Sequence, residues 1–201
     1  DQPRSRGLGD VYKRQLISEF VTKDLRNNMA ILPIIIAPDP RLKAKCDPVE
    51  KVTPELVKLM DDMLDTMYDA PGIGLAAPQV GRRQQIIVAD VSKQEDVRDP
   101  YQMINPEILW TSKDFFSYEE GCLSLPEQYA DVMRPKQVRI RFLDKTGCSQ
   151  IIEVEDLLAV CLQHEMDHLK GILFVDHISK LKRDLIMRKL RKMKKLEKKG
   201  K

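Results

Sequence analysis

The chain has 201 residues, of which 42% are apolar and 32% charged, and its net charge is +3. This length suits one well-cored domain, and the composition is typical of a folded globular protein and excludes an intrinsically disordered chain. The apolar stretch Ile31–Ala37 is interrupted by Pro33 and is too short to cross a bilayer, and no secretory leader is apparent. We therefore expect a cytoplasmic protein with no membrane segment.

The charge is distributed unevenly along the chain. Residues 180–201 carry twelve Lys or Arg and two acids, a local net charge of +10. The remaining 179 residues therefore sum to −7. An acidic body with a basic tail bears on the partners of a protein rather than on its chemistry.

The first 28 residues differ in composition from the rest of the chain. They mix Gly, Arg and Asp, contain one brief apolar patch at Leu16–Val21, and end just before Met29, where a clean apolar segment begins. We interpret residues 1–28 as a non-native N-terminal extension and Met29 as the true start of the protein. The alternative is a natural, disordered extension.

The first predicted element is a helix that begins at Thr53-Pro54-Glu55. A capping hydroxyl, a proline at the first helical position and an acid in the first turn follow one another there. Pro71-Gly72 ends the helix. Between these signals, apolar residues recur at helical spacing at Leu56, Met60, Met63, Leu64 and Met67.

Between Gln84 and Asp156 the pattern predicts short β-strands. Gln85–Val91 is an apolar run typical of a buried strand, and apolar residues alternate with charged ones over residues 138–142. Asp144–Gly147 is typical of a hairpin turn and leads into a strand at Ile151–Val154.

Two more helices complete the prediction. One spans Asp156–Leu169 and is capped by Gly171. The other begins near Ser179, is basic, and is expected to carry its apolar residues along one side: Leu181, Leu185, Ile186, Leu190, Met193 and Leu196. Helices that flank a run of antiparallel strands predict an α+β domain.

The second of these helices carries the pattern H-E-x-x-H at His164-Glu165-Met166-Asp167-His168. Residues four apart share one face of a helix, so both imidazoles can bind one metal ion, and Glu165 lies near enough to handle a proton of bound water. The alternative is a surface helix with two ordinary histidines. However, two of the three histidines of the chain fall here, on the apolar side of the helix.

A catalytic metal site of this kind needs a third protein ligand. His177 lies nine residues beyond His168, past the predicted end of the helix, and we interpret it as structural or solvated. Cys122 follows a predicted strand and can complete a Cys–His–His set, although a lone cysteine is more often a small core residue. The other cysteines are widely scattered, which favours free thiols over disulfides: Cys46, Cys148 and Cys161.

Three segments resemble the three signature motifs of peptide deformylases, in the order and with the separation found in that family. They are Gly72-Ile-Gly-Leu-Ala-Ala-Pro-Gln79, Glu120-Gly-Cys-Leu-Ser124 and Gln163-His-Glu-Met-Asp-His168. The resemblance covers most of residues 29–195. It implies a bacterial-type metal-dependent hydrolase that removes the formyl group from the N-terminal formylmethionine of nascent polypeptides and releases formate.

The resemblance also implies an organisation for the chain. Residues 29–178 are the catalytic domain and residues 179–201 a basic C-terminal helix. Antiparallel β-strands are packed around a central metal-binding helix, with an N-terminal helix beside them. A monomer is expected from the same resemblance.

The roles of the site residues follow from the resemblance as well. Glu165 takes a proton from the attacking water and returns it to the leaving amine. The family's motifs assign the side-chain amide of Gln79 and the backbone N–H of Leu123 as donors to the oxyanion; without those motifs, Gln79 would be taken for a polar loop residue. The implied ligands of a divalent ion, which lowers the pKa of its bound water to about 7, are Cys122, His164 and His168.

The substrate is expected to be bound mainly through its main chain. Gly72 and Gly74 permit close backbone approach, so an extended peptide can pair with Ile73 and Gly74 like an added strand. Arg134 is expected either to pair with Glu120 or to be a plain surface charge. The resemblance implies a methionine pocket lined by Tyr118, Tyr129, Leu157, Val160 and Cys161, although core packing explains the last three equally well.

The metal expected from the resemblance is Fe²⁺, with Zn²⁺, Ni²⁺ or Co²⁺ as alternatives. A thiolate and two imidazoles bind zinc more tightly than ferrous iron, but affinity order does not decide which metal a cell supplies. Oxidation of the iron or of the Cys122 thiolate would destroy such a site, so we expect an oxygen-sensitive enzyme.

The basic tail allows three interpretations: a solvated helix, a membrane-surface segment or an arm that contacts RNA. It has no aromatic residue to anchor it in a lipid interface. The resemblance favours docking to ribosomal RNA near the exit tunnel. Two rival functions are an H-E-x-x-H metallopeptidase, which would leave Cys122 and Gln79 unused, and a ribosome-binding protein with a vestigial site.

Overall fold

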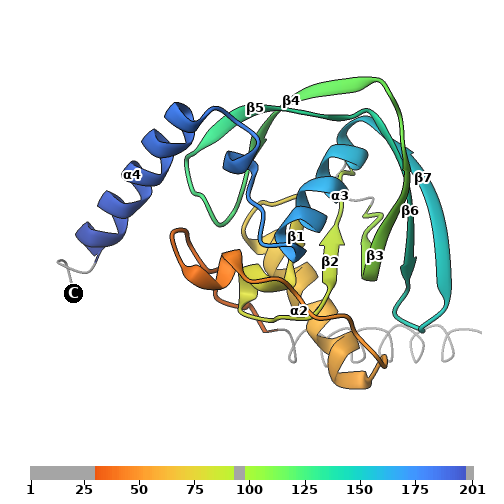
Figure 1. Ribbon diagram of the computed structural model, residues 1–201. Helices are drawn as coiled ribbons and strands as arrows, with labels where there is room; N and C mark the ends of the chain where they lie inside the picture. Colours follow the sequence, from red (N-terminus) through yellow and green to blue (C-terminus); the bar gives the residue numbers. More distant parts are fainter. Residues whose placement is uncertain (1–29, 93–97, 198–201) are drawn as a thin grey trace, which may run out of the picture. The chain divides into compact units, whose positions relative to one another are not determined.

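The computed structural model describes residues 30–92 and 98–197 (Figure 1). The predicted N-terminal extension, residues 1–28, lies outside these ranges. Every element described below belongs to the compact unit Ile31–Lys201.

The helix α2 (Pro54–Asp69) begins where the sequence predicts it. The Thr53 hydroxyl accepts a hydrogen bond from the Leu56 backbone N–H at 3.3 Å, and Pro54 occupies the first turn. Its buried apolar residues pack against the strands that follow, as the helical spacing predicts: Leu56, Met60, Met63 and Met67.

Five antiparallel strands form the main sheet in the order β1-β2-β3-β6-β7 (Figure 1). Their bounds are β1 (Gly74–Ala76), β2 (Ile86–Ala89), β3 (Tyr101–Thr111), β6 (Gln137–Leu143) and β7 (Ser149–Glu155). A separate two-stranded antiparallel sheet joins β4 (Phe115–Gly121) to β5 (Tyr129–Pro135). Strand β1 stands at one edge of the larger sheet, which leaves its outer side available for pairing.

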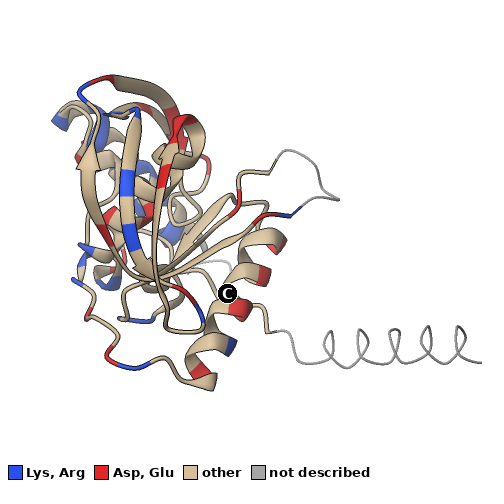
Figure 2. Cartoon of the chain, turned by 90° about the vertical axis from the view of Figure 1, so that its right-hand side faces the viewer, with Lys and Arg blue, Asp and Glu red and all other residues tan. Residues whose placement is uncertain are grey.

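Strand β2 explains the continuous apolar run in the sequence, because both of its faces are covered. Ile86 and Val88 pack with α2, whereas Ile87 and Ala89 pack with the helix α3 (Asp156–Leu169). On β6, by contrast, buried apolar residues alternate with Arg139 and Arg141, which form ion pairs across the exposed face of the sheet. In Figure 2, β6 carries blue segments, and the neighbouring strands β3 and β7 carry the red segments of its acidic partners.

Helix α3 is the central element of the domain. All residues from Ala159 to Met166 are buried, so this helix is enclosed on every side rather than amphipathic. It contacts β1 and β2 of the larger sheet and β4 and β5 of the smaller one. Polar side chains at its middle are therefore held away from bulk water, and the predicted α+β architecture around a central helix is confirmed.

The C-terminal helix α4 (Lys180–Glu197) departs from the prediction in one respect. Its apolar residues do not share one side: Ile186 and Leu190 are buried, whereas Leu181 and Leu185 are 73% and 48% exposed. The physical reason is the helical repeat, since Leu190 follows Leu181 by nine residues, or about two and a half turns. The buried pair packs on the short helix η3 (Phe174–Asp176) and on nearby loop residues. Leu196, also on the outer side, is 60% exposed.

No helix within residues 30–92 and 98–197 combines the length and the apolar character that crossing a bilayer requires.

Candidate metal centre and active site

Helix α3 brings together three of the predicted site residues. His164, Glu165 and His168 are all buried, with exposures of 7%, 4% and 1%. The two imidazole rings lie one helical turn apart, with their centroids separated by 4.9 Å and their planes at 77°. The H-E-x-x-H segment is therefore not an ordinary surface helix.

Cys122, which follows a strand of the smaller sheet, lies beside the two histidines of α3. It follows the last residue of β4, and its Sγ lies 3.3 Å from Nε2 of His168. One donor atom from each of Cys122, His164 and His168 lies within 4.8 Å of the other two. A tetrahedral ion with a metal–sulfur bond near 2.3 Å and metal–nitrogen bonds near 2.1 Å holds its donors about 3.4–3.6 Å apart, and the 3.3 Å between Cys122 Sγ and His168 Nε2 is close to this spacing. The donor set fits a divalent transition metal.

A buried ionic network orients the first histidine. Nδ1 of His164 lies 2.7 Å from the Glu120 carboxylate, which leaves Nε2 for the metal. Glu120 also accepts hydrogen bonds from Arg134 at 2.5 and 3.1 Å. Burial alone would raise the pKa of Glu120, but the contacts with His164 and Arg134 lower it to about 2, so the carboxylate stays ionised. Of the two roles considered for Arg134, the structure shows the pairing with Glu120.

The network extends to a residue that sequence reasoning set aside. Arg134 donates to Asp167 at 2.8 Å, and Nε2 of His177 lies 2.7 Å from the same carboxylate oxygen. His177 is therefore connected to the metal-site helix through Asp167, although it is not near enough to be a ligand. No periodicity in the sequence signals this contact, since the two residues belong to different elements.

Glu165 has the surroundings of a group that exchanges protons near neutral pH. Burial raises its pKa to about 7. One of its oxygens, Oε2, has no hydrogen-bond partner among the described residues and remains free for a water molecule or a substrate. Gly74 lies directly against it: a Cβ at that position would stand 2.4 Å from Oε1. The absence of a side chain at Gly74 therefore leaves room for the Glu165 carboxylate beside β1; the approach of a peptide backbone to this glycine stays a prediction.

The side chain of Gln79 is fixed in one orientation. Its Oε1 accepts a hydrogen bond from the Ala76 backbone N–H at 2.7 Å, so the amide nitrogen must face the other way. That nitrogen lies 3.2 Å from the Ser124 hydroxyl and 3.5 Å from Cys122 Sγ. The donor end of the amide thus points at the metal ligand, which is the direction an oxyanion donor needs.

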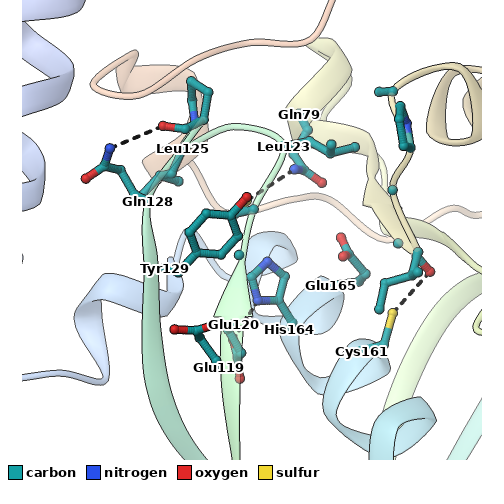
Figure 3. A pocket seen from close by; sticks show the side chains of 18 of the residues that line it. Gln79, Glu119, Glu120, Leu123, Leu125, Gln128, Tyr129, Cys161, His164 and Glu165 are labelled. Atoms are coloured by element: carbon teal, nitrogen blue, oxygen red, sulfur yellow. Dashed lines mark hydrogen bonds and ion pairs between the residues drawn. The ribbon is translucent and has the colours of Figure 1, made fainter.

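These groups open into one cavity of about 520 Å³ (Figure 3). Its lining includes ten residues proposed from the sequence: Ile73, Gly74, Gln79, Tyr118, Cys122, Leu123, Tyr129, Cys161, His164 and Glu165. His168, at 1% exposure, is not among the lining residues. Leu157 and Val160 are not among the lining residues, and Val160 is packed at 2% exposure.

The cavity also has walls that the sequence did not single out. Leu125 and Gln128 line it from the loop between β4 and β5, and Gln128 donates to the Pro126 carbonyl at 3.3 Å (Figure 3). Their position directly after the Glu120–Ser124 motif is the one signal that could have pointed to them.

Comparison with known proteins agrees with this geometry. The family model described as Polypeptide deformylase matches residues 31–184. A peptide deformylase of Mesorhizobium japonicum is 53% identical over 173 residues, covering 86% of this chain and 98% of its own. The crystal structure of peptide deformylase from Ehrlichia chaffeensis superposes with a TM-score of 0.79 at 39% identity, over 84% of this chain and 99% of that one. A peptide deformylase from Legionella pneumophila gives 0.77 at 45% identity, over 84% and 98%. A match of this extent, centred on a Cys–His–His cluster, shows that the chain belongs to the polypeptide deformylase family.

Proposed function

We propose that Cys122, His164 and His168 hold one divalent metal ion, and that Glu165 serves the reaction at that ion. As a peptide deformylase, the chain is a metal-dependent amide hydrolase that removes the formyl group from the N-terminal formylmethionine of nascent polypeptides and releases formate. The observation that carries the site assignment is the buried Cys–His–His cluster beside a carboxylate oxygen without a partner among the described residues.

The residues divide the chemistry among them. The ion, when bound, supplies the Lewis acidity that makes water a nucleophile near neutral pH. Glu165 takes the proton of the attacking water and returns it to the leaving amine, so that the C–N bond breaks as formate leaves. The amide N–H of Gln79 and the backbone N–H of Leu123 donate to the formyl oxygen, which becomes an oxyanion when the formyl carbon is attacked.

The peptide binds along the edge of the larger sheet. Strand β1 is the edge strand, so the main chain of an extended peptide can be added beside Ile73 and Gly74. The formylmethionine side chain enters the cavity, between Tyr118 and Tyr129 at the rim and Cys161 at the base. Leu157 and Val160 shape this pocket from behind, since Val160 is packed on the same helix as Cys161.

The metal is proposed to be Fe²⁺, with Zn²⁺, Ni²⁺ and Co²⁺ as possible substitutes. The donor set suits each of these ions, and the preference for iron rests on the family resemblance. A thiolate ligand makes such a site sensitive to oxidation in air.

The test is formate release from formyl-Met-Ala by protein loaded with Fe²⁺ without oxygen, beside Glu165→Gln loaded in the same way. We expect the variant to lose at least 100-fold in kcat, the usual range for removing a proton-transfer group, while it still binds metal. Zinc-loaded protein is expected to be slower. Full activity of Glu165→Gln would contradict the role of Glu165, and full, air-stable activity with zinc alone would contradict the assignment of iron.

We also infer that the enzyme acts as a monomer in the cytoplasm and that α4 contacts ribosomal RNA. The support for RNA binding is the exposed basic surface of α4, which includes Arg188, Lys189 and Lys192. The division into a catalytic part, residues 29–178, and a ribosome-binding helix, residues 179–201, belongs to the same proposal. A metallopeptidase is excluded by the family match, and the intact ligand cluster argues against a vestigial site.

A further inference from the structure

A buried polar contact joins the end of α2 to the end of β2, outside the cavity. Tyr68 lies in the last turn of α2, and its hydroxyl donates to Oδ2 of Asp90 at 2.5 Å. Asp90 directly follows β2 and is only 5% exposed. Its other oxygen accepts from the Ser92 backbone N–H at 2.9 Å, so both carboxylate oxygens are engaged.

The same two ends support the segment that is proposed to pair with the peptide. The Asp90 backbone N–H donates to the Ile73 carbonyl at 2.9 Å, and the Gly72 N–H donates to the Met67 carbonyl at 2.9 Å. The short stretch between α2 and β1 is therefore held at one end by α2 and at the other by Asp90. The hydrogen bond between Tyr68 and Asp90 joins the end of α2 directly to the end of β2, and so fixes to each other the two elements that hold this stretch.

Burying the Asp90 carboxylate costs free energy of desolvation, which only well-placed hydrogen bonds can offset. Burial raises the pKa of Asp90, but the hydrogen bonds from Ser92 and Tyr68 more than offset this, so the pKa lies below its usual value. Burial and the neighbouring Asp90 raise the pKa of Tyr68, so the hydroxyl keeps its proton. The Arg98 guanidinium stacks on the Tyr68 ring at 4.1 Å and covers it. An apolar pair would fill this space without desolvating a carboxylate, but it would not specify one orientation.

We propose that Tyr68 and Asp90 are positioning residues for substrate binding. They hold the Ile73 carbonyl inside the sheet, where it accepts from the Asp90 N–H and from the Cys161 thiol at 3.3 Å, and in this way they set the orientation of the adjoining outer edge of β1, beside which an extended peptide is proposed to pair. Neither residue lines the cavity or contacts the metal ligands, so their effect is on the affinity for the peptide main chain and not on bond cleavage. The inference rests on the proposed pairing at Ile73 and Gly74.

The test compares Tyr68→Phe with wild type, both loaded with metal, on two substrates. Formyl-Met can enter the pocket but has no following residues to pair with β1, whereas formyl-Met-Ala-Ser has them. We expect Tyr68→Phe to raise the KM for formyl-Met-Ala-Ser roughly 3–10-fold, about the effect of one hydrogen bond, with kcat within twofold of wild type. The KM for formyl-Met is expected to stay within twofold. Tyr101→Phe, which removes a hydroxyl from the strand paired with Ala89, is the matched control and should leave both KM values unchanged.

A second measurement reports on the segment directly. Amide hydrogen exchange over residues 70–75 should be faster in Tyr68→Phe than in wild type or in Tyr101→Phe, because the variant lacks the hydrogen bond that fixes Asp90 to α2. If Tyr68→Phe does not fold, Asp90→Asn serves instead. Its amide oxygen can replace only one of the two acceptors, and the same rise in KM is expected.

The outcomes separate this inference from the proposal beneath it. If wild type binds formyl-Met and formyl-Met-Ala-Ser equally well, the pairing at β1 is wrong, and the positioning role is overturned with it. If wild type prefers the longer substrate and Tyr68→Phe keeps that preference, only the positioning role is overturned. An equal loss on both substrates would also overturn it, since that result indicates a general disturbance of the fold.

Discussion

The four cysteines lie in surroundings that make their reactivity a test of the metal site. Burial raises the pKa of the Cys46 thiol to about 11 and that of Cys161 well above its usual value, so neither is readily ionised. Cys148 is exposed, and Cys122 is half-buried at the cavity wall. The structure thus offers two accessible thiols, of which one is the proposed metal ligand.

We expect iodoacetamide at pH 7.5 to modify Cys148 alone in metal-loaded protein, and both Cys148 and Cys122 after a chelator removes the metal. Coordination partly neutralises the thiolate charge and covers one side of the sulfur, so a bound thiolate is a much poorer nucleophile than a free one. Peptide mass spectrometry identifies the modified residues, and Cys122→Ser provides the control with one modified thiol in both states. Equal modification of Cys122 with and without metal would contradict its role as a ligand.

At the residue scale, the sequence predicted those groups that a short motif defines. Two histidines four residues apart on a helix must share a face, and the structure brings Cys122 to them. The contacts of Tyr68 with Asp90 and of His177 with Asp167 were not predicted. Each joins two elements that no spacing rule connects, so only the packing of the whole chain reveals them.

At the element scale, the hairpin between β6 and β7 depends on one carboxylate. Asp144 Oδ1 accepts hydrogen bonds from the Thr146 N–H, the Thr146 hydroxyl and the Cys148 N–H, and Oδ2 accepts from Gln150 at 2.8 Å. The bonds from Thr146 and Gln150 lower the pKa of Asp144 to about 2, against an ordinary value of 3.8. The ionised carboxylate thus organises the turn that the sequence predicted.

Because the folded-state pKa is the lower one, the stabilisation from Asp144 is fully present above pH 4 and is lost as the pH falls towards 2. Asp144→Ala should therefore lower the urea midpoint at pH 7, and the difference from wild type should shrink between pH 4 and pH 2.5. Denaturation followed by circular dichroism measures both midpoints. A difference that is constant over this range would show that the carboxylate charge does not contribute.

Elements with a clear period were predicted well, and those whose burial depends on tertiary contacts were not. The capped helix α2 and the alternating strand β6 follow from local patterns. The burial of α4 could not be predicted, because its seven apolar residues are spread around the helix and only the elements beneath it determine which of them are covered. Strand β3 is likewise shifted in register against β6, near Asn105, which adopts a positive φ of 51°.

At the scale of the whole molecule, the basic helix predicts an association that depends on salt. Replacing Arg188, Lys189 and Lys192 by Gln removes three exposed charges without touching the buried residues Ile186 and Leu190. In co-sedimentation with purified ribosomes, the slope of log K against log salt should fall by roughly 2–3. Formate release from formyl-Met-Ala should be unchanged, which controls for folding. An unaltered salt slope would contradict RNA binding through this surface of α4.

The three proposed ligands come from two separate parts of the chain, since Cys122 follows β4 and the histidines belong to α3. During synthesis, 46 residues must be added between Cys122 and His168, which takes roughly 2–9 s at about 5–20 residues per second. Throughout that interval the thiol has no complete ligand set beside it. The proposed metal site therefore cannot be complete before His168 has been added, and a newly made chain carries an oxidisable cysteine before it can carry an ion.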